Sequence, residues 1–220
     1  MDRQARTTTT GVKTAGKKVG RKPAFTEQDV IAAVLEEGID RFTLAGVAKR
    51  LGVVTAAIYR LYGSREDIVV ATLDHIAATF RVPDADADWQ AVLRLWADEC
   101  WRLCDDFPGL SRVVYSYAPA FTRIEHVIAE YARCLARSGK SPKQAMFALD
   151  FVGDTVFACY LGVESWRNRD DGGVSGFDQV KEVVEPGSII EPREAWLERG
   201  AVDVKVDFIL VGLEHSWPEI

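Results

Sequence analysis

One stretch, residues 43–62 with the sequence TLAGVAKRLGVVTAAIYRLY, constrains the fold most, because its spacing predicts two short helices joined at a glycine. The first helix begins after an N-cap at Thr43 and carries its apolar side chains on one face: Leu44, Val47, Ala48 and Leu51. Gly52 ends it, and a second helix over residues 55–62 turns three side chains inward: Ile58, Leu61 and Tyr62. This pattern is typical of a helix-turn-helix, which places its second helix in the DNA major groove.

Helix signals on both sides of this stretch distinguish it from an ordinary antiparallel helix pair in an all-α core. Upstream, Thr26 and Asp29 form a pattern like a capping box, and the helix they open ends at Gly38. Its buried stripe is predicted to be Val30, Ile31, Val34 and Leu35. Downstream, Ser64 begins a further helix. The sequence therefore predicts three short helices followed by a longer one.

With these motifs, residues 24–80 resemble the tetracycline-repressor (TetR) family of bacterial transcriptional regulators. The matching positions are Thr43, Leu51-Gly52-Val53, Ile58-Tyr59 and Ser64-Arg65-Glu66. Residues 138–164 and 206–215 resemble the tetracycline-repressor-like branch of the same family, so the resemblance covers nearly the whole chain. It implies an all-α protein with an N-terminal three-helix DNA-binding domain and a C-terminal helical domain for ligand binding and dimerisation.

The recognition helix is expected to contact double-stranded operator DNA. The predicted contact residues are Thr43, Thr55, Ala57, Tyr59, Arg60 and Arg65. Of the side chains exposed on this helix, only Arg60 can make a bidentate contact with guanine. Tyr59 and Arg65 are expected to hold phosphates.

The charge of the chain is unevenly distributed, although its net value is −6. Residues 1–65 hold 12 Lys or Arg and 6 Asp or Glu, whereas residues 66–220 hold 15 and 27. A basic N-terminal part suits contact with phosphates. Residues 1–22 lack an apolar period and are predicted to be a disordered basic arm, with four basic residues that can reach a minor groove or remain a solvated tail: Lys17, Lys18, Arg21 and Lys22.

Composition and length predict the domain plan. A chain of 220 residues, 48% of them hydrophobic, can bury a sizeable core. The expected divisions are the arm at 1–22, the helix-turn-helix domain at 23–66 and the effector-binding and dimerisation domain at 67–220. The most apolar run, residues 145–163, contains Asp150 and Asp154, so no membrane span is expected and the predicted location is cytoplasmic.

The C-terminal part carries two helices that need more than one apolar partner. Residues 145–163 are apolar on every side, which favours burial against a second chain, although a central helix wrapped by its own domain is the alternative. The final helix, residues 202–216, carries two apolar stripes. The predicted homodimer interface is Gly153, Val156, Ala158, Gly162, Phe208, Val211 and Gly212.

The resemblance further implies a four-helix bundle between two copies and a ligand pocket beneath it. The expected effector-binding residues are Trp96, Cys100, Tyr115, Tyr117, Phe147, Phe151 and Asp154. Tetracycline recognition in the family depends on imidazoles and a carboxylate, positions that Val114 and Gly162 fill here. We therefore expect a flat, apolar or aromatic small molecule in place of a metal chelate. Residues 167–200 form a long segment that is mobile or functional.

Other chemistry finds little support in the sequence. Cys100 and Cys104 share a helix face, but no His or third Cys lies near them, so reduced buried thiols are expected and no metal site. Asp150 and Asp154 lack the flanking groups of a catalytic centre, and no enzyme activity or cofactor is expected. Two hypotheses remain. One is a ligand-responsive, homodimeric repressor released from a palindromic operator. The alternative is an all-α dimeric ligand-binding or scaffold protein without DNA-binding activity.

Overall fold

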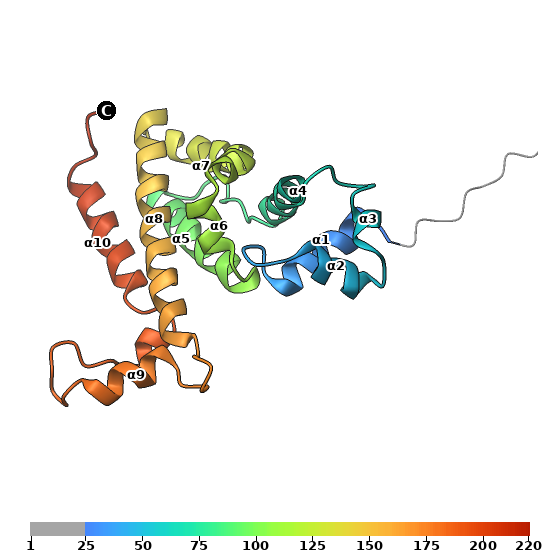
Figure 1. Cartoon of the computed structure of the whole chain (residues 1–220). Coiled ribbons are helices and arrows are strands. Elements are labelled where there is room, and N and C mark those ends of the chain that lie inside the picture. Colours follow the sequence, from blue (N-terminus) through green and yellow to red (C-terminus); the bar gives the residue numbers. More distant parts are fainter. Residues whose placement is uncertain (1–24) are drawn as a thin grey trace, which may run out of the picture.

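A computed structural model describes residues 25–220, and the predicted basic arm at 1–22 lies outside the described residues. Within that range the fold is all-α (Figure 1). The elements are α1 (Glu27–Glu37), α2 (Leu44–Leu51), α3 (Thr55–Ile58), α4 (Arg65–Ala77), α5 (Trp89–Asp106), α6 (Leu110–Ser116), the 3₁₀-helix η1 (Ala118–Ile124), α7 (Glu125–Arg137), α8 (Pro142–Arg167), α9 (Gly176–Val183), the 3₁₀-helix η2 (Glu194–Leu197) and α10 (Val202–His215).

Side-chain caps set the starts of α1, α4 and α8. Thr26 and Asp29 form a complete capping box on α1, and Ser141 and Gln144 form another on α8. Ser64 caps α4 by accepting a hydrogen bond from the backbone N–H of Asp67 at 3.0 Å. Each cap satisfies a backbone donor that the first helical turn leaves free.

Buried side chains form two hydrophobic clusters. The first gathers the buried faces of α1, α2, α3 and α4 together with side chains from α5, α6 and η1, such as Leu103 and Leu110. The second is built on α5, α7, α8 and α10. Helix α4 lies between the α1–α3 unit and the long helices α5 and α8 (Figure 1). We call α1–α3, residues 25–62, the head. The domain boundary predicted between residues 66 and 67 stays a prediction, because α4 follows this boundary but packs in the same hydrophobic cluster as α1–α3.

The recognition helix is shorter than predicted. Regular α-helix covers only Thr55–Ile58, and the chain continues through turns to Tyr62. Ile58 and Tyr62 point inward as predicted, with 0% and 7% of their surface exposed. Leu61 does not, because it is 37% exposed. The turn after Ile58 breaks the helical period that placed Leu61 on the buried face.

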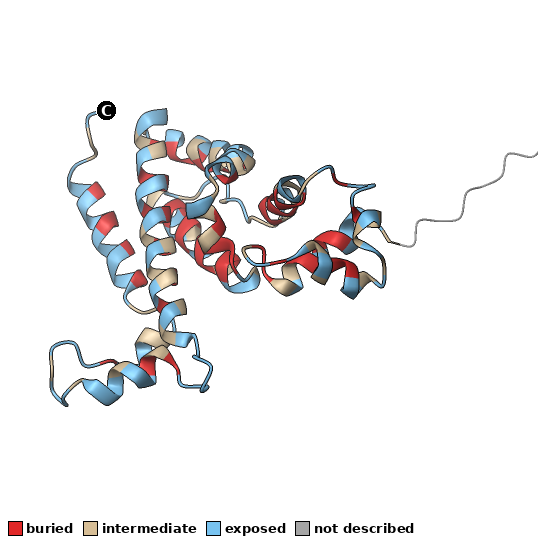
Figure 2. Cartoon of the chain, viewed as in Figure 1, coloured by how far each residue is buried: buried red, intermediate tan, exposed pale blue. Residues whose placement is uncertain are grey.

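Helix α8 is the longest element and runs beside α5 and α10. Among the described helices it alone is long and apolar enough to cross a membrane by length and composition, a test that core helices also pass. Its buried stripe, which includes Leu149, Val152 and Val156, packs in the second cluster. The opposite side stays exposed within the chain (Figure 2).

The long connection after α8 is structured. Arg169 and Ser175 form an isolated antiparallel bridge, after which Ser175 caps α9. Trp166 contacts both Phe177 and Trp196, with ring centroids 6.4 and 5.5 Å away. These rings hold α9 and η2 against the end of α8.

Candidate DNA-binding face and ligand cavity

Thr43 and Gly52 set the geometry of the helix-turn-helix. The Thr43 hydroxyl accepts a hydrogen bond from the Gly46 N–H at 3.0 Å, and the Glu37 carboxylate accepts one from the Thr43 N–H at 3.2 Å. Gly52 ends α2 with φ +67° and donates its N–H to the last turn. Because only glycine adopts this conformation readily, the direction of α3 depends on it. Thr43 is therefore first a helix cap, whatever else it contacts.

Four of the side chains predicted to contact DNA lie in α3 or directly after it. Tyr59 is 51% exposed, Arg60 is exposed, and Thr55 and Ala57 are half-buried. Arg65 lies at the start of α4 with its guanidinium 4.2 Å from the centroid of the Phe42 ring. This cation–π contact orients Arg65 while leaving it exposed.

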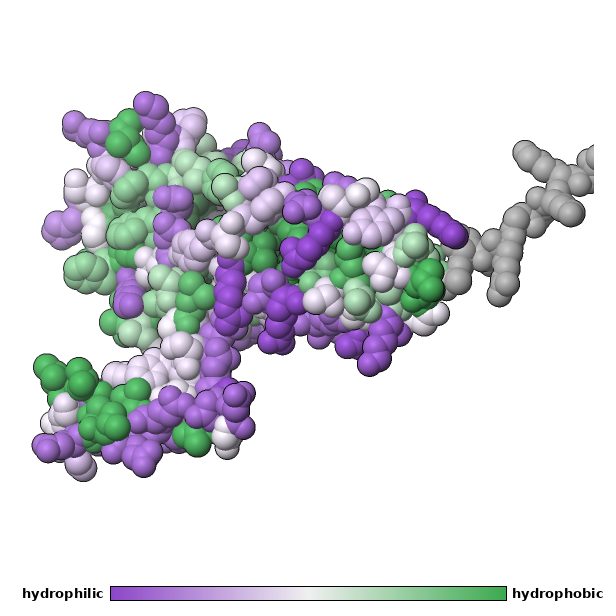
Figure 3. Space-filling view, viewed as in Figure 1, coloured by the Kyte–Doolittle hydropathy of each residue, from purple (hydrophilic) through white to green (hydrophobic). Residues whose placement is uncertain are grey.

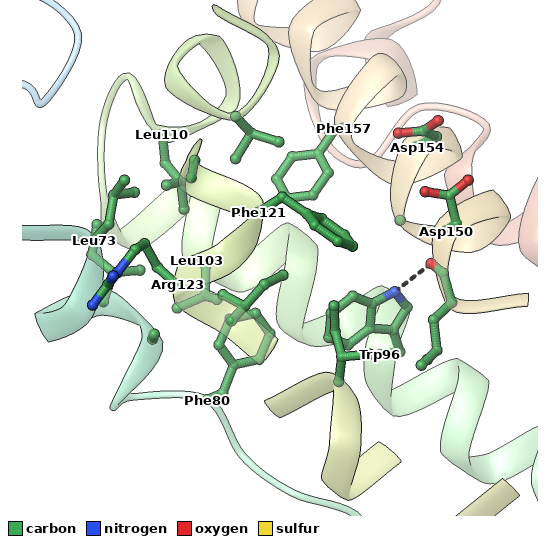
Figure 4. A pocket seen from close by; sticks show the side chains of 18 of the residues that line it. Leu73, Phe80, Trp96, Leu103, Leu110, Phe121, Arg123, Asp150, Asp154 and Phe157 are labelled. Atoms are coloured by element: carbon green, nitrogen blue, oxygen red, sulfur yellow. Dashed lines mark hydrogen bonds between the residues drawn. The ribbon is translucent and has the colours of Figure 1, made fainter. Parts of the chain in front are cut away.

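A cavity of about 200 Å³ lies where α4, α5, α6, η1, α7 and α8 meet (Figure 4). Phe80 stacks on Trp96 with centroids 5.5 Å apart, and the Trp96 Nε1–H donates to the Leu149 carbonyl at 2.8 Å. The lining residues are Leu73, Ile76, Ala77, Phe80, Trp96, Leu103, Leu110, Val114, Tyr115, Ala120, Phe121, Arg123, Ile124, Ile128, Met146, Leu149, Asp150, Gly153, Asp154 and Phe157. Such a mainly apolar wall with few polar groups is typical of a small-molecule site.

Charged side chains line opposite sides of this cavity. Arg123 is held by a bidentate ion pair with Asp74 of α4, at 2.7 and 2.8 Å. Asp150 and Asp154 lie across the cavity on α8 (Figure 4). Desolvation, and then the neighbouring charge of Asp150, raises the pKa of Asp154. The Tyr115 hydroxyl donates to the Asp154 carbonyl at 3.2 Å, and burial raises the pKa of Tyr115.

The structure brings three of the predicted effector-binding residues into the cavity lining: Trp96, Tyr115 and Asp154. The others lie elsewhere. Cys100 is fully buried behind the wall, where burial raises the pKa of its thiol, and Tyr117 packs against the core of the head. Phe147 and Phe151 point out of α8, 38% and 47% exposed, with centroids 5.8 Å apart.

The residues predicted to form the dimer interface fall into an exposed group and a buried group. Ala158, Gly162, Phe208, Val211 and Gly212 are exposed on α8 and α10. Gly153 and Val156 are buried inside the chain, so their assignment to a dimer interface is wrong. An added Cβ on Gly153 would lie 3.2 Å from Trp96 Nε1, which means that this glycine allows the indole to approach α8.

An ion pair that the sequence did not single out joins the head to α6. Arg112 pairs with Asp40 at 2.9 Å and with Glu164 of α8 at 3.0 Å. Gly109, with φ +88°, comes so close to Asp40 that an added Cβ would meet its Oδ1 at 2.0 Å. Arg112 therefore joins the head to both α6 and α8.

The segment after α4 is fixed to α5 by the buried Glu99. Its carboxylate accepts hydrogen bonds from the Arg81 backbone N–H at 2.8 Å and from Arg102 at 2.7 Å. Burial disfavours the charge on Glu99, but these donors outweigh it and lower its pKa to about 2. Tyr131 adds a hydrogen bond to the Arg81 carbonyl at 2.7 Å. The C-terminal end of α4 is thus anchored while its face lines the cavity.

Metal-binding groups are sparse in the described part of the chain. Residues 25–220 contain no group of three or more His, Cys, Asp or Glu side chains placed to hold a metal ion. All four cysteines are free, and three of them are buried.

Comparisons with known proteins agree with this architecture. Residues 31–72 match the model of the family described as bacterial regulatory proteins, tetR family. A substituted TetR from Acinetobacter baumannii AYE in complex with minocycline superposes with a TM-score of 0.62 at 21% identity, over 89% of this chain and 99% of that one. A possible TetR family transcriptional regulator from Streptomyces coelicolor A3(2) gives 0.64 at 20% identity, over 86% and 97%. No curated protein matches significantly.

Proposed function

We propose that the chain is a tetR-family regulator, on the match of residues 31–72 and the fold shared with the two solved structures, and that it is a homodimeric repressor that a small apolar or aromatic effector releases from a palindromic operator. The family match and the shared fold support regulation of transcription through DNA binding, with a ligand as the signal. The repressor role, the dimer, the cytoplasmic location, the absence of enzyme activity and the kind of effector are our proposal.

The observation that carries the proposal is the position of α4 between the two candidate sites. Its first turn follows the recognition segment directly, at Arg65, and its later residues Leu73, Ile76 and Ala77 line the cavity. A ligand in the cavity would therefore contact the helix that follows the recognition segment and carries Arg65. The minocycline complex of a similar protein supports a small molecule as occupant.

We propose that the ligand acts by favouring one of two orientations of α4 and the head. A ligand shifts such an equilibrium only through its different affinities for the two states. Arg123–Asp74 and Arg112–Asp40 are the ion pairs that would differ between them. In the released state, the two recognition segments would no longer match successive major grooves, which are about 34 to 36 Å apart.

An exposed apolar face on α8 and α10 supports the homodimer. Val204, Phe208 and Val211 of α10 are 72%, 80% and 59% exposed. Helix α10 packs beside α8, and both helices have exposed stretches (Figure 2). Hydrophobic side chains also gather over this side in the space-filling view (Figure 3). Small residues at Ala158, Gly162 and Gly212 would allow close approach of helices from two copies.

The dimer is tested by light scattering at micromolar concentration. Phe208→Asp, which places a charge in the proposed seam, should give monomers. Val183→Asp is the matched control, because Val183 is similarly exposed, at 79%, but lies on α9. A wild-type protein that is monomeric, or equal behaviour of both variants, contradicts the dimer.

DNA binding is tested by selecting bound duplexes from a random pool. The proposal predicts enrichment of a palindrome whose half-sites are about one helical turn, or a multiple of it, apart. Recovery of no preferred sequence by a folded dimer would favour a scaffold or ligand-binding protein without DNA-binding activity.

A further inference from the structure

The charges around the cavity do not balance. Among the residues that the structure describes, three charged side chains line it: Arg123, Asp150 and Asp154. Arg123 already forms two hydrogen bonds with Asp74, so its charge is compensated from outside the cavity. Neither aspartate has an ion-pair partner among residues 25–220, and the nearest cation on the lining lies on the other side of the cavity (Figure 4). The cavity therefore carries two negative charges on one side, both on side chains that are also exposed to solvent.

The two carboxylates act on the same space because they lie on one face of α8. Residues four apart in a helix are neighbours, and like charges at that spacing repel each other. The raised pKa of Asp154 has burial as its main cause and Asp150 as its second, which agrees with an unfavourable charge there. A ligand cation between them would relieve this repulsion.

Aromatic rings complete the environment. Phe80, Trp96, Phe121 and Phe157 line the cavity together with Tyr115, whose ring meets that of Phe157 edge-on at 6.4 Å between centroids. The faces of aromatic rings attract cations, and their area favours a flat apolar body. Apolar burial and negative charge therefore occur in one site.

We propose that the effector is an aromatic or otherwise lipophilic cation, with an apolar body in the Phe80–Trp96 part of the cavity and a positively charged nitrogen beside Asp150 and Asp154. This inference rests on the proposed function, since it assigns a ligand class to the cavity of the regulator. It differs from an uncharged aromatic effector in requiring the two carboxylates.

The test compares three probes that share one ring system: 2-naphthylmethylammonium, 2-naphthylmethanol and 2-naphthoate. Binding to the full-length protein is measured by calorimetry, with quenching of tryptophan fluorescence as a second readout, because Trp96 lies in the cavity wall. The cation is expected to bind about tenfold more tightly than the alcohol, and the carboxylate more weakly than either, as expected for partly exposed charge contacts.

Two double variants separate a local contact from general attraction to an acidic protein. Asp150→Asn with Asp154→Asn should reduce the preference for the cation to about twofold or less, because the amides keep shape but lose charge. Asp84→Asn with Asp171→Asn removes the same charge at exposed positions outside the cavity lining and should keep the tenfold preference. Circular dichroism checks that both are folded.

Equal affinity for the cation and the alcohol, or a cation preference that survives loss of both cavity carboxylates, overturns the inference but leaves the regulator intact. Binding that requires added magnesium also overturns it. If none of the three probes binds, the cavity assignment fails together with the inference, whereas operator selection by the ligand-free protein tests DNA binding independently.

Discussion

The head and the region around the cavity fill their interiors differently. In the head, aliphatic side chains and the rings of Phe42 and Tyr62 fill the centre together, and Val47 and Ile58 have no exposed surface. Around the cavity, larger side chains such as Phe80 and Trp96 pack on one side and leave about 200 Å³ on the other. A filled core keeps a single shape, whereas an unfilled space makes stability and conformation depend on what enters it. The head is therefore suited to binding a DNA surface of fixed shape, and the cavity region is suited to responding to a ligand.

Ile58→Ala in the head is expected to give the largest difference between the effects on operator binding and on ligand binding. Loss of this fully buried side chain should cost roughly 2 to 5 kcal/mol of stability. Operator affinity should fall strongly, because α3 has only four residues and depends on this contact. Affinity for a cavity ligand should not change. Denaturant unfolding and the two binding assays measure these effects.

Leu61→Ala is the matched control for that experiment. Leu61 is 37% exposed, so its truncation should cost about 1 kcal/mol or less. Equal destabilisation by both variants would mean that the regular recognition helix extends to Tyr62, as the sequence pattern predicts.

Phe157→Ala in the cavity wall is expected to affect ligand binding and to leave operator binding unchanged. Loss of its ring should weaken binding of an aromatic ligand by roughly 1.5 to 3 kcal/mol, since this apolar contact area is removed. Operator affinity of the ligand-free protein should stay the same. Phe151→Ala, which lies earlier on α8 and outside the cavity lining, should leave ligand affinity unchanged. A larger ligand effect of Phe151→Ala would place the site on the outer face of α8.

Prediction from the sequence succeeded where contacts are local. The caps at Thr43 and Ser64 and the turn at Gly52 depend on neighbours within four residues, and the structure has all three. The short recognition helix was the exception, because a helical period over 55–62 cannot show where turns replace the last helical hydrogen bonds.

The cavity was harder to predict because six elements distant in sequence build it. Apolar character alone could not decide which side of α8 faces inward, so Phe147 and Phe151 were assigned to the pocket and Gly153 to the surface. Phe121 lines the cavity from the 3₁₀-helix η1, an element that no pattern in the sequence singled out. The spacing of Asp150 and Asp154 was visible in the sequence, yet their lack of partners needed the structure.

A smaller effect, confined to the head, is expected from Arg60→Ala. Loss of a bidentate guanine contact should cost roughly 1 to 3 kcal/mol at the selected operator and relax base preference at one position. Arg65→Ala should weaken binding to operator and random DNA alike, since phosphate contacts carry no sequence information. Fluorescence anisotropy with both duplexes measures the difference. Equal losses on both duplexes for Arg60→Ala contradict base readout by this residue.

The smallest effect is expected at the contact that joins the two regions. Arg112→Met keeps the apolar stem but removes the ion pairs with Asp40 and Glu164. The ligand and operator affinities measured separately should change little, while the coupling between them should fall by about 0.5 to 2 kcal/mol. Arg94→Met, which removes an ion pair with Asp207 at the surface, should leave the coupling unchanged.

The central claim is that the cavity and the DNA-binding face form one coupled system, and reciprocity of binding tests it most directly. The affinity for 2-naphthylmethylammonium is measured by calorimetry with and without saturating operator duplex. If cavity occupancy releases DNA, operator must weaken probe binding by the same factor by which the probe weakens operator binding, typically about 5- to 150-fold. Equal probe affinities in the presence and absence of operator would contradict the account.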